Sequence, residues 1–465
     1  MIRIAFCQHF FYEQLGVMLM SAQLKKQGHY VEVFIKDLTD LYRRIEEFDL
    51  VCFTMMTPDV GWTVKNLKEI KTIDKHILTI AGGPYTTFFP NFIEECGHID
   101  IICVGEGDEA ILELADAIDK KIGFTKIQNL IVKTKDNKIV KNPLRPLIKD
   151  LDQLPFCDRE IYDKYKYFNE MPFTNIMAIR GCPYKCTFCF NHSYNKLYNE
   201  FKFRLRSPKN VINEVKQILK KRDIKMLMFT DSTFNLDVNW CIDFFALYKK
   251  ELNVPFTINL AVNACKERVI EAIADTGCCQ FVRMGIESGS EKIRKDVMKK
   301  NFTNKRLMEV TKILQKNNID YVTYWIFGVP FETKEDAIET IKIARQTNSN
   351  GMDCFLFRPY RGLDITSMAL ENNFITEQDL RNIEESYGHH SVMHMKDIQV
   401  IENIFYLFRL FIYFPKMEKF LIKLAELKPN AFYRLVSILI YGFEMRKLSF
   451  GFKRTLIEIF YHKDE

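Results

Sequence analysis

The sequence predicts an α/β protein with three parts: an N-terminal doubly wound Rossmann-like domain, a central partial (β/α)6 barrel and a C-terminal helical region. Short apolar runs alternate with segments that repeat apolar residues at helical spacing, first in the N-terminal third and again from Thr174 to about Arg358. Strands that alternate with helices form βαβ units and hence parallel sheets. Beyond about Thr376 only helical patterns rich in Phe, Tyr, Leu and Lys remain.

The first domain is expected over residues 1–142. Its predicted strands are Ile2–Phe6, Tyr30–Ile35, Leu50–Thr54, Ile77–Ala81 and Ile101–Val104. The helical pattern occupies Leu15–Gln27, Val60–Ile73 and Glu109–Ile118. The polar stretch 121–142 predicts a short hairpin that ends the domain.

Residues 143–170 are expected to form an extended linker on the surface, because prolines at 143, 146 and 155 interrupt both helices and central strands. The barrel follows over 171–370. Its expected strands are Thr174–Ile179, Met226–Thr230, Thr257–Asn263, Phe281–Ile286, Tyr321–Phe327 and Cys354–Arg358. These six units fall short of the eight in a complete barrel. Residues 371–465 form the predicted helical domain.

Composition narrows the function. The 465 residues are 47% hydrophobic and 27% charged, as in ordinary globular proteins. A net charge of +6 is too small to indicate nucleic-acid binding. The N-terminus has no signal-peptide pattern, and no run of about 18 apolar residues occurs. We therefore expect a cytoplasmic protein whose 13 cysteines are mostly reduced thiols.

One cysteine motif carries the chemistry. Cys182, Cys186 and Cys189 follow a predicted strand in the pattern C-x3-C-x2-C. Thiolates suit iron–sulfur clusters, and three ligands would leave one iron of a 4Fe-4S cluster open, as a catalytic metal site requires. The alternative is a zinc site completed by His192.

With Phe188 just before the third cysteine, this motif resembles the signature of the radical S-adenosylmethionine (SAM) superfamily. The resemblance implies that the open iron binds the amino and carboxylate groups of SAM. Reductive cleavage of SAM would then give methionine and a 5′-deoxyadenosyl radical. The zinc alternative does not account for the family-like segments that follow downstream.

Three downstream segments extend the resemblance. FTDSTF implies that Asp231 contacts the SAM amino group, although Asp231 could instead cap the next helix. GIESGS implies that Glu287 binds the SAM ribose, the alternative being a charge that favours a helix N-terminus. GVPFET resembles the family's G-x-P-G-E-T, which implies that Gly328 and Pro330 belong to a cofactor-binding turn.

Two departures from the family pattern are present. Phe331 stands where the family has a second glycine, so the turn is expected to differ locally. Arg361 replaces a proline in PYRG, a stretch that otherwise resembles the family's P-Y-P-G-T.

The first domain resembles the cobalamin-binding domain that precedes many radical SAM domains, in the class B methyltransferase-like subfamily. Its segments AGGPYTTFFP and ICVGEGDEAILEL carry the similarity. The implied cobalamin-binding residues are Thr54, Gly82, Gly83, Gly105 and Gly107. The alternative is a sheet with ordinary turn glycines that binds nothing. The family's Asp-x-His-x-x-Gly loop is absent and His9 lacks its spacing, so His9 is expected to be a solvated loop residue.

The C-terminal region combines broad apolar faces with Lys and Arg. Helices that pack on the main body are expected, and a monotopic membrane contact or a pocket for an apolar substrate is the alternative. His389, His390 and His394 are interpreted as solvated, with substrate contact as the alternative. Cys278, Cys279 and Cys354 are expected to be buried thiols.

Together these patterns predict a cobalamin-dependent radical SAM enzyme that methylates an unactivated carbon. A radical reaction without methyl transfer and a non-catalytic zinc-binding scaffold are the alternatives. The implied cofactors are a 4Fe-4S cluster, SAM and cobalamin. Expected partners are a small-molecule or apolar substrate and an external electron donor of the flavodoxin or ferredoxin type.

Overall fold

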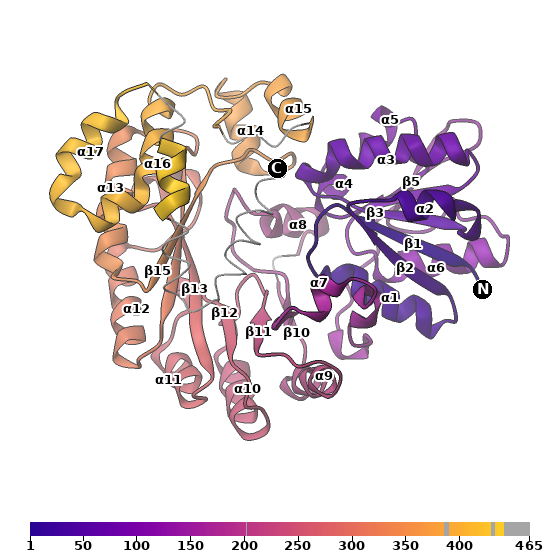
Figure 1. Cartoon of the computed structure of the whole chain (residues 1–465), viewed down its shortest axis with the longest axis horizontal. Coiled ribbons are helices and arrows are strands. Elements are labelled where there is room, and N and C mark those ends of the chain that lie inside the picture. Colours follow the sequence, from indigo (N-terminus) through magenta and orange to yellow (C-terminus); the bar gives the residue numbers. More distant parts are fainter. Residues whose placement is uncertain (201, 386–389, 429–432, 441–465) are drawn as a thin grey trace.

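The computed structural model describes residues 1–200, 202–385, 390–428 and 433–440. Two α/β parts lie side by side (Figure 1). Of the C-terminal helices, α16 (Ile398–Tyr413) and α17 (Glu418–Ala425) lie at the far edge of the second part, whereas α14 (Asp364–Glu371) and α15 (Glu377–Glu385) lie nearer the first part. This architecture confirms the predicted fold class.

The N-terminal sheet has the strand order β2-β1-β3-β4-β5-β6-β7. The strands are β1 (Arg3–Gln8), β2 (Tyr30–Ile35), β3 (Leu50–Thr54), β4 (Leu78–Gly82), β5 (Ile101–Cys103), β6 (Leu130–Lys133) and β7 (Ile139–Lys141). Strands β1 to β5 are parallel, whereas β6 and β7 form the predicted hairpin. The strand order reverses between β1 and β3, which is where doubly wound sheets bind ligands beyond their carboxyl ends.

Helices cover both faces of this sheet (Figure 1). They are α1 (Leu15–Lys26), α2 (Thr39–Arg43), α3 (Val60–Ile73), α4 (Pro84–Phe88), α5 (Phe92–Glu95) and α6 (Asp108–Asp119), with the short turns η1 (Ile45–Glu47) and η2 (Thr57–Asp59). The apolar side chains of α1 and α6 pack on one face, and those of α3 and α5 pack on the other. Each face therefore has its own hydrophobic core.

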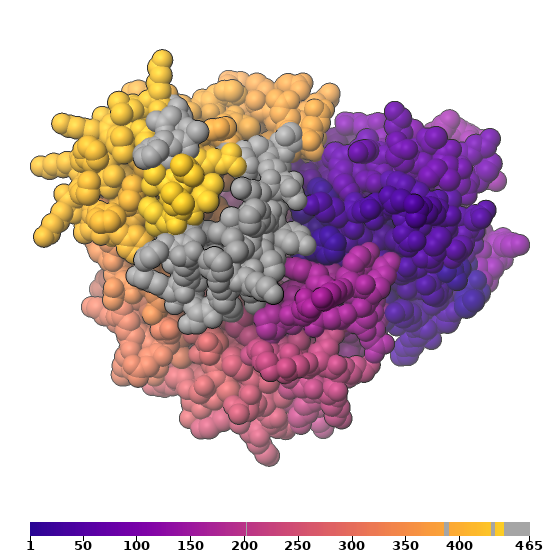
Figure 2. Space-filling model, viewed as in Figure 1, coloured from indigo at the N-terminus to yellow at the C-terminus, as the bar shows by residue number. Residues whose placement is uncertain are grey.

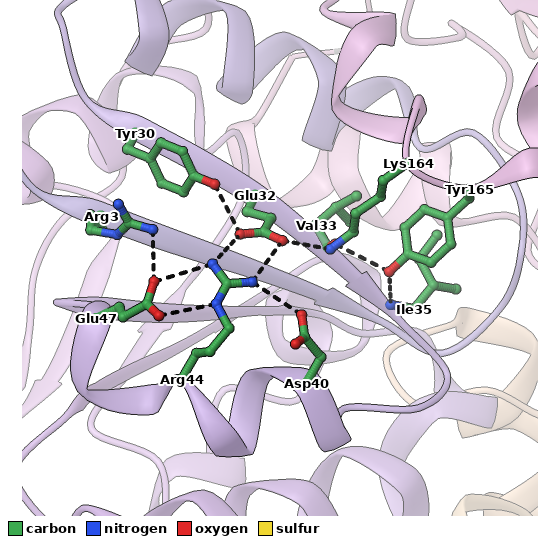
Figure 3. A network of polar contacts seen from close by, with 10 residues as sticks. All are labelled: Arg3, Tyr30, Glu32, Val33, Ile35, Asp40, Arg44, Glu47, Lys164 and Tyr165. Carbon is green, nitrogen blue, oxygen red and sulfur yellow. Dashed lines mark hydrogen bonds and ion pairs between the residues drawn. The ribbon is translucent and has the colours of Figure 1, made fainter.

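The segment 143–170 is more closely packed than the expected surface linker. It contains η3 (Leu151–Gln153), η4 (Arg159–Tyr162) and α7 (Lys166–Asn169). Tyr162 and Phe168 are buried in the core of the N-terminal domain. Lys164 pairs with Glu32 at 2.7 Å, and the Tyr165 hydroxyl accepts a hydrogen bond from the Ile35 amide at 3.0 Å (Figure 3). Aromatic side chains in a proline-rich stretch were the signal for this packing.

The second sheet is wholly parallel, in the order β15-β14-β13-β12-β11-β8. Its strands are β8 (Phe173–Ile176), β11 (Met226–Phe229), β12 (Phe256–Asn259), β13 (Cys279–Glu287), β14 (Tyr321–Phe327) and β15 (Gly351–Leu356). The connecting elements are α9 (Pro208–Lys221), α10 (Val238–Glu251), η5 (Val262–Ala264), α11 (Glu267–Asp275), η6 (Ile293–Val297), α12 (Asn304–Lys316) and α13 (Lys334–Thr347). Six parallel strands with helices outside confirm the partial barrel.

The first predicted barrel strand is interrupted in the structure. Ile179–Arg180 forms a separate strand, β9, which pairs antiparallel with β10 (Arg204–Leu205). The cysteine loop leads from β9 into α8 (Phe190–Tyr198), and α8 lies between the two α/β parts in Figure 1. This break turns the chain toward the N-terminal domain just before the cysteines.

The C-terminal region is helical in its described part. It contains α14 (Asp364–Glu371), α15 (Glu377–Glu385), α16 (Ile398–Tyr413), η7 (Pro415–Met417) and α17 (Glu418–Ala425). Helix α16 packs on α13 and β15, whereas α15 packs on α3 and η2 of the N-terminal domain. Among the described residues, no helix is both long enough and apolar enough to cross a membrane.

Candidate active site

The cysteine loop lies at the carboxyl end of the barrel sheet. Cys182 is buried, whereas Cys186 and Cys189 are partly exposed. The Cys182 sulfur lies 3.6 Å from the Thr233 hydroxyl, and the Asn191 amide donates to the Cys189 sulfur at 3.6 Å. Polar groups from the ends of other elements therefore already surround two of the three sulfurs.

The described residues contain no group of three or more His, Cys, Asp or Glu side chains placed to hold a single metal ion. His192 Nε2 lies 3.0 Å from Asp364 Oδ2 instead of completing a cysteine site. The predicted zinc alternative therefore lacks its ligand set. A 4Fe-4S cluster requires a different placement of the cysteine sulfurs, because each cysteine binds its own iron and the sulfurs need not converge on one ion.

Lys300 joins the cysteine loop to the end of β13. Its ammonium group lies 2.8 Å from Glu287 Oε1 and 5.8 Å from the centre of the Phe188 ring. Burial is the largest single influence on the pKa of Lys300 and lowers it, but the charge and hydrogen bond of Glu287, together with the charges of Cys186 and Cys189, raise the pKa overall. Burial raises the pKa of the Cys186 thiol to about 12, and the Lys300 charge opposes that shift. Glu287 and Phe188 thus meet beside the cysteines through a lysine that no sequence motif indicated.

Asp231 follows β11 and is only 1% exposed. Its Oδ1 accepts hydrogen bonds from the amides of Ala178 and Ile179. Its Oδ2 is buried and has no hydrogen-bond partner in the described part of the chain. The helix-cap alternative for Asp231 is wrong, because Asp237 caps α10 by accepting from the Trp240 amide at 2.9 Å. Burial raises the pKa of Asp231 to about 7, against the effect of its backbone hydrogen bonds.

The turn after β14 keeps a left-handed residue despite the missing glycine. Phe331 has φ 64°, a conformation that costs a residue with a side chain roughly 1–2 kcal/mol. Its ring packs edge-on against Phe374, with centroids 4.9 Å apart. A change in this turn was expected because Phe331 is not a glycine. The contact with Phe374 could not be predicted from the residue type.

Within that turn Glu332 binds the backbone of Gly328 and Val329, the two residues between the end of β14 and Pro330. Glu332 Oε2 accepts from both amides, and Oε1 is buried without a partner among the described residues. The Gly328 amide is therefore satisfied inside the protein. Burial raises the pKa of Glu332 to about 8.

The raised pKa of Glu332 predicts a specific pH dependence of stability. The folded protein binds this proton more tightly than the unfolded chain, whose glutamate pKa is near 4.5. The stabilisation is complete below about pH 4.5 and is lost as pH rises through about 8. We expect Glu332→Gln, which still accepts from Gly328, to lose less stability between pH 6 and 9 than the wild type. Urea unfolding across this range measures the difference, and parallel profiles would contradict the expectation.

An inter-domain cavity of about 820 Å³ opens beyond the carboxyl ends of the N-terminal sheet. Its size is at the upper end of small-molecule sites, which span roughly 300–1,000 Å³. The predicted cobalamin-binding residues Thr54, Gly82, Gly83, Gly105 and Gly107 all line it. They come from the ends of β3, β4 and β5, next to the β1/β3 reversal. They therefore lie where a doubly wound sheet would bind a ligand.

The barrel supplies the opposite wall of the cavity. Its lining residues there include Ala178–Gly181, Asn191 and Thr230–Ser232. Asn191 Nδ2 also donates to Ser232 Oγ at 2.8 Å, in addition to its contact with Cys189. The cavity and the cysteine loop therefore share Asn191 as a common wall.

Ion pairs hold the loop after β5 against the barrel. Arg180 binds Asp108 through both guanidinium nitrogens at 3.0 Å, and Arg204 binds Glu106. The Tyr198 hydroxyl accepts from the Glu106 amide at 3.1 Å. Asp108 begins α6, one residue before the expected helix, and its carboxylate also binds Arg180 across the domain interface.

Two helix contacts strengthen this interface. Arg361, which replaces the family's proline, pairs with Glu377 and Glu384 and lies 4.6 Å from the Phe89 ring centre. Phe88 stacks on Phe190 at 5.2 Å. The replacement of proline thus adds a link between α15 and the N-terminal domain.

His9, His390 and His394 make their contacts outside the cysteine loop. His9 is not the solvated residue that we expected: its ring is 23% exposed, lies 3.4 Å from Asp59 and stacks on Trp62. His390 and His394 are largely exposed and pair with Glu402 and Asp379. His389 lies outside the described residues. Among the other thiols, Cys278 is buried as expected, whereas Cys279 and Cys354 are only partly buried.

Together the fold and the site define an α/β enzyme in which a three-cysteine loop and a large inter-domain cavity share one wall. Comparison with known proteins assigns the parts: residues 176–344 match the Radical SAM superfamily and residues 4–115 match the B12 binding domain. An uncharacterized methyltransferase of Pyrococcus horikoshii is 30% identical, over 79% of this chain and 80% of the relative. The chain therefore belongs to the radical SAM superfamily and carries an N-terminal B12 binding domain.

Other relatives share the architecture. The anaerobic magnesium-protoporphyrin IX monomethyl ester cyclase of Rubrivivax gelatinosus is 27% identical, over 75% of this chain and 65% of the cyclase. The radical SAM methyltransferase TsrM of Kitasatospora setae, solved with cobalamin and a [4Fe-4S] cluster bound, superimposes with a TM-score of 0.65 at 18% identity, covering 80% of this chain and 78% of TsrM. The predicted cofactors, a 4Fe-4S cluster, SAM and cobalamin, are those of this family. The hypothesis of a non-catalytic zinc scaffold is set aside.

Proposed function

We propose that this protein is a cobalamin-dependent radical SAM methyltransferase that acts on an unactivated carbon. The observation that carries the proposal is the shared wall at Asn191, which contacts the Cys189 sulfur and lines the inter-domain cavity. Because of this wall, a substrate at the barrel mouth would lie within reach of both cofactor sites. The methyltransferase relative of Pyrococcus horikoshii supports the same outcome.

In this proposal Cys182, Cys186 and Cys189 hold the cluster, and the five residues Thr54, Gly82, Gly83, Gly105 and Gly107 cradle cobalamin. When bound, these cofactors and SAM supply an adenosyl radical and a transferable methyl group. Glu287, oriented by Lys300, presents a carboxylate to the SAM hydroxyls, and Asp231 Oδ2 offers an unused acceptor to the SAM amino group. The Gly328–Pro330 turn, braced by Glu332, closes the same end of the barrel.

The rest of the chain positions these groups and excludes water. The Arg180–Asp108 ion pair, beside the cavity, keeps the two domains in register. An external one-electron donor of the flavodoxin or ferredoxin type would reduce the cluster. A reaction without methyl transfer is the second candidate, favoured by the similarity to the Rubrivivax gelatinosus cyclase.

Product analysis distinguishes the two candidates. Anaerobically reconstituted protein would be incubated with SAM, cobalamin and a strong reductant, and its products separated by chromatography. We expect both 5′-deoxyadenosine and S-adenosylhomocysteine. Methyl transfer would use one SAM as the source of the adenosyl radical and another as the methyl donor. Deoxyadenosine alone would favour the non-methylating reaction. If protein with a full iron content formed neither deoxyadenosine nor S-adenosylhomocysteine, the proposal would be contradicted.

A further inference from the structure

The C-terminal helix α17 has an apolar face turned to solvent. Met417, which precedes the helix, Phe420 within it and Leu427 just beyond its last turn are 44%, 57% and 56% exposed. Their spacing of three and seven residues places them on one side of the helix. We call these three residues the α17 stripe. Large apolar side chains that gather in this way indicate an interaction surface.

The fold does not need this stripe for its own core. Leu421 and Ala425, on another side of α17, are buried against the barrel's helical layer. The Asn403 amide donates to the Ala425 carbonyl at 2.8 Å, and Tyr433 donates to the Leu424 carbonyl at 2.9 Å. The orientation of α17 is thus set by contacts that leave the stripe outward.

Lysines that have no ion pair among the described residues lie beside the stripe. Lys416, Lys419 and Lys423 are exposed, and no salt bridge of theirs occurs among the described residues. At 100° per residue, Lys419 and Lys423 lie along one edge of the stripe. The two acidic residues of the segment are already neutralised, because Glu418 pairs with Arg345 and Glu426 pairs with Lys334. The surface therefore presents apolar side chains beside a row of available cations.

We propose that the α17 stripe binds the surface of an anionic lipid bilayer, with α17 lying in the plane of the headgroups. Apolar side chains that enter the acyl boundary and lysines that meet anionic headgroups are the two elements of interfacial helix binding. A second copy of this chain fits less well. A two-fold contact through the stripe would bring the same lysine row close to itself, and like charges across an interface are unfavourable.

The position of α17 in the molecule suits this role. Its yellow side chains project from the outer edge of the molecule, away from the indigo N-terminal domain (Figure 2). Helix α17 lies at the edge of the barrel away from the N-terminal domain (Figure 1). Docking through the stripe would leave the two domains unobstructed. The proposal is independent of the proposed methyl transfer, because lipid binding needs no turnover.

Vesicle flotation with the reconstituted full-length protein tests the proposal. We expect binding to phosphatidylcholine–phosphatidylglycerol vesicles, little binding to phosphatidylcholine alone, and weaker binding as salt is added. Lys419→Gln/Lys423→Gln should weaken binding to the anionic vesicles about 30-fold, the change that corresponds to about 1 kcal/mol per lysine. Met417→Ser/Phe420→Ser should also weaken it.

The matched control is Lys65→Gln/Lys68→Gln, which removes the same charge from exposed positions of α3 in the other domain. Circular dichroism and iron content should be unchanged in all variants, so that a folding defect is recognised. Absence of binding to anionic vesicles would overturn the proposal, as would equal losses in the α17 and α3 variants. A dimer that the stripe variants dissociate, without vesicle binding, would identify a second copy as the occupant and would also overturn it.

Discussion

Replacing Cys186 by alanine is expected to abolish reductive cleavage of SAM while leaving the protein folded. Changes to residues that only support metal ligands typically cost about 10–100-fold, so loss of a ligand should cost more than about 100-fold. Cys186 is partly exposed and lies in a loop, so its removal leaves no large cavity in the core. The measurement is 5′-deoxyadenosine formation, together with iron content and the visible absorbance of the cluster.

Cys278→Ala is the matched control. Cys278 is also a reduced cysteine of the barrel, but it precedes β13 at the end of the strand opposite Glu287. We expect its iron content and deoxyadenosine formation to match the wild type. If Cys186→Ala kept a full iron content and normal SAM cleavage, the three-cysteine assignment would be wrong. If both variants lost iron equally, the effect would be general instability rather than loss of a ligand.

The sequence indicated residues whose placement follows from topology. Thr54, Gly82 and Gly105 are distant in the chain, yet all follow parallel strands, and the carboxyl ends of parallel strands meet at one edge of a sheet. Their convergence on one cavity could therefore be predicted without coordinates. The three cysteines could likewise be predicted from the sequence, because eight consecutive residues carry the whole motif.

Residues that act across elements could not be predicted in this way. Lys300 is one of two adjacent lysines in a charged stretch, and only the fold brings it to Glu287. Arg180 and Asp108 lie in different domains, so their pairing depends on how the domains dock. Asn191 follows the third cysteine closely, but its contact with Ser232 requires the β11 end to lie beside α8. In each case the partner's position is a long-range property that local patterns do not contain.

The two glycines after β5 differ in backbone conformation and in how closely the opposite domain approaches them. Gly105 has φ 82°, and a Cβ atom there would lie 2.0 Å from the Tyr198 hydroxyl of the opposite domain. Gly107 has an ordinary φ of −91°, and the nearest atoms to its added Cβ would lie at 3.5 Å. Both glycines line the cavity. The structure therefore separates two positions that look alike in sequence.

We expect Gly105→Ala to lower the free energy of unfolding by about 2–4 kcal/mol, since it adds left-handed strain to a clash at the interface. Tyr198 must move, and its hydrogen bond with the Glu106 amide is then lost. Because Gly105 and Glu106 themselves line the cavity, a shift of this loop should weaken cobalamin binding at least about ten-fold, as about 1.4 kcal/mol would cause. Urea unfolding and cobalamin titration by absorbance measure the two effects.

Gly107→Ala is the control, and we expect changes in stability of no more than about 0.5 kcal/mol and near-normal cobalamin binding. Adding Tyr198→Phe to Gly105→Ala separates the two causes of damage. The double variant should recover part of the lost affinity if the clash with the hydroxyl dominates, and none if backbone strain dominates. If the Gly105 and Gly107 variants had the same stability and the same cobalamin affinity, the close approach of Tyr198 would not shape the cavity. The cobalamin site would then depend on the strand ends alone.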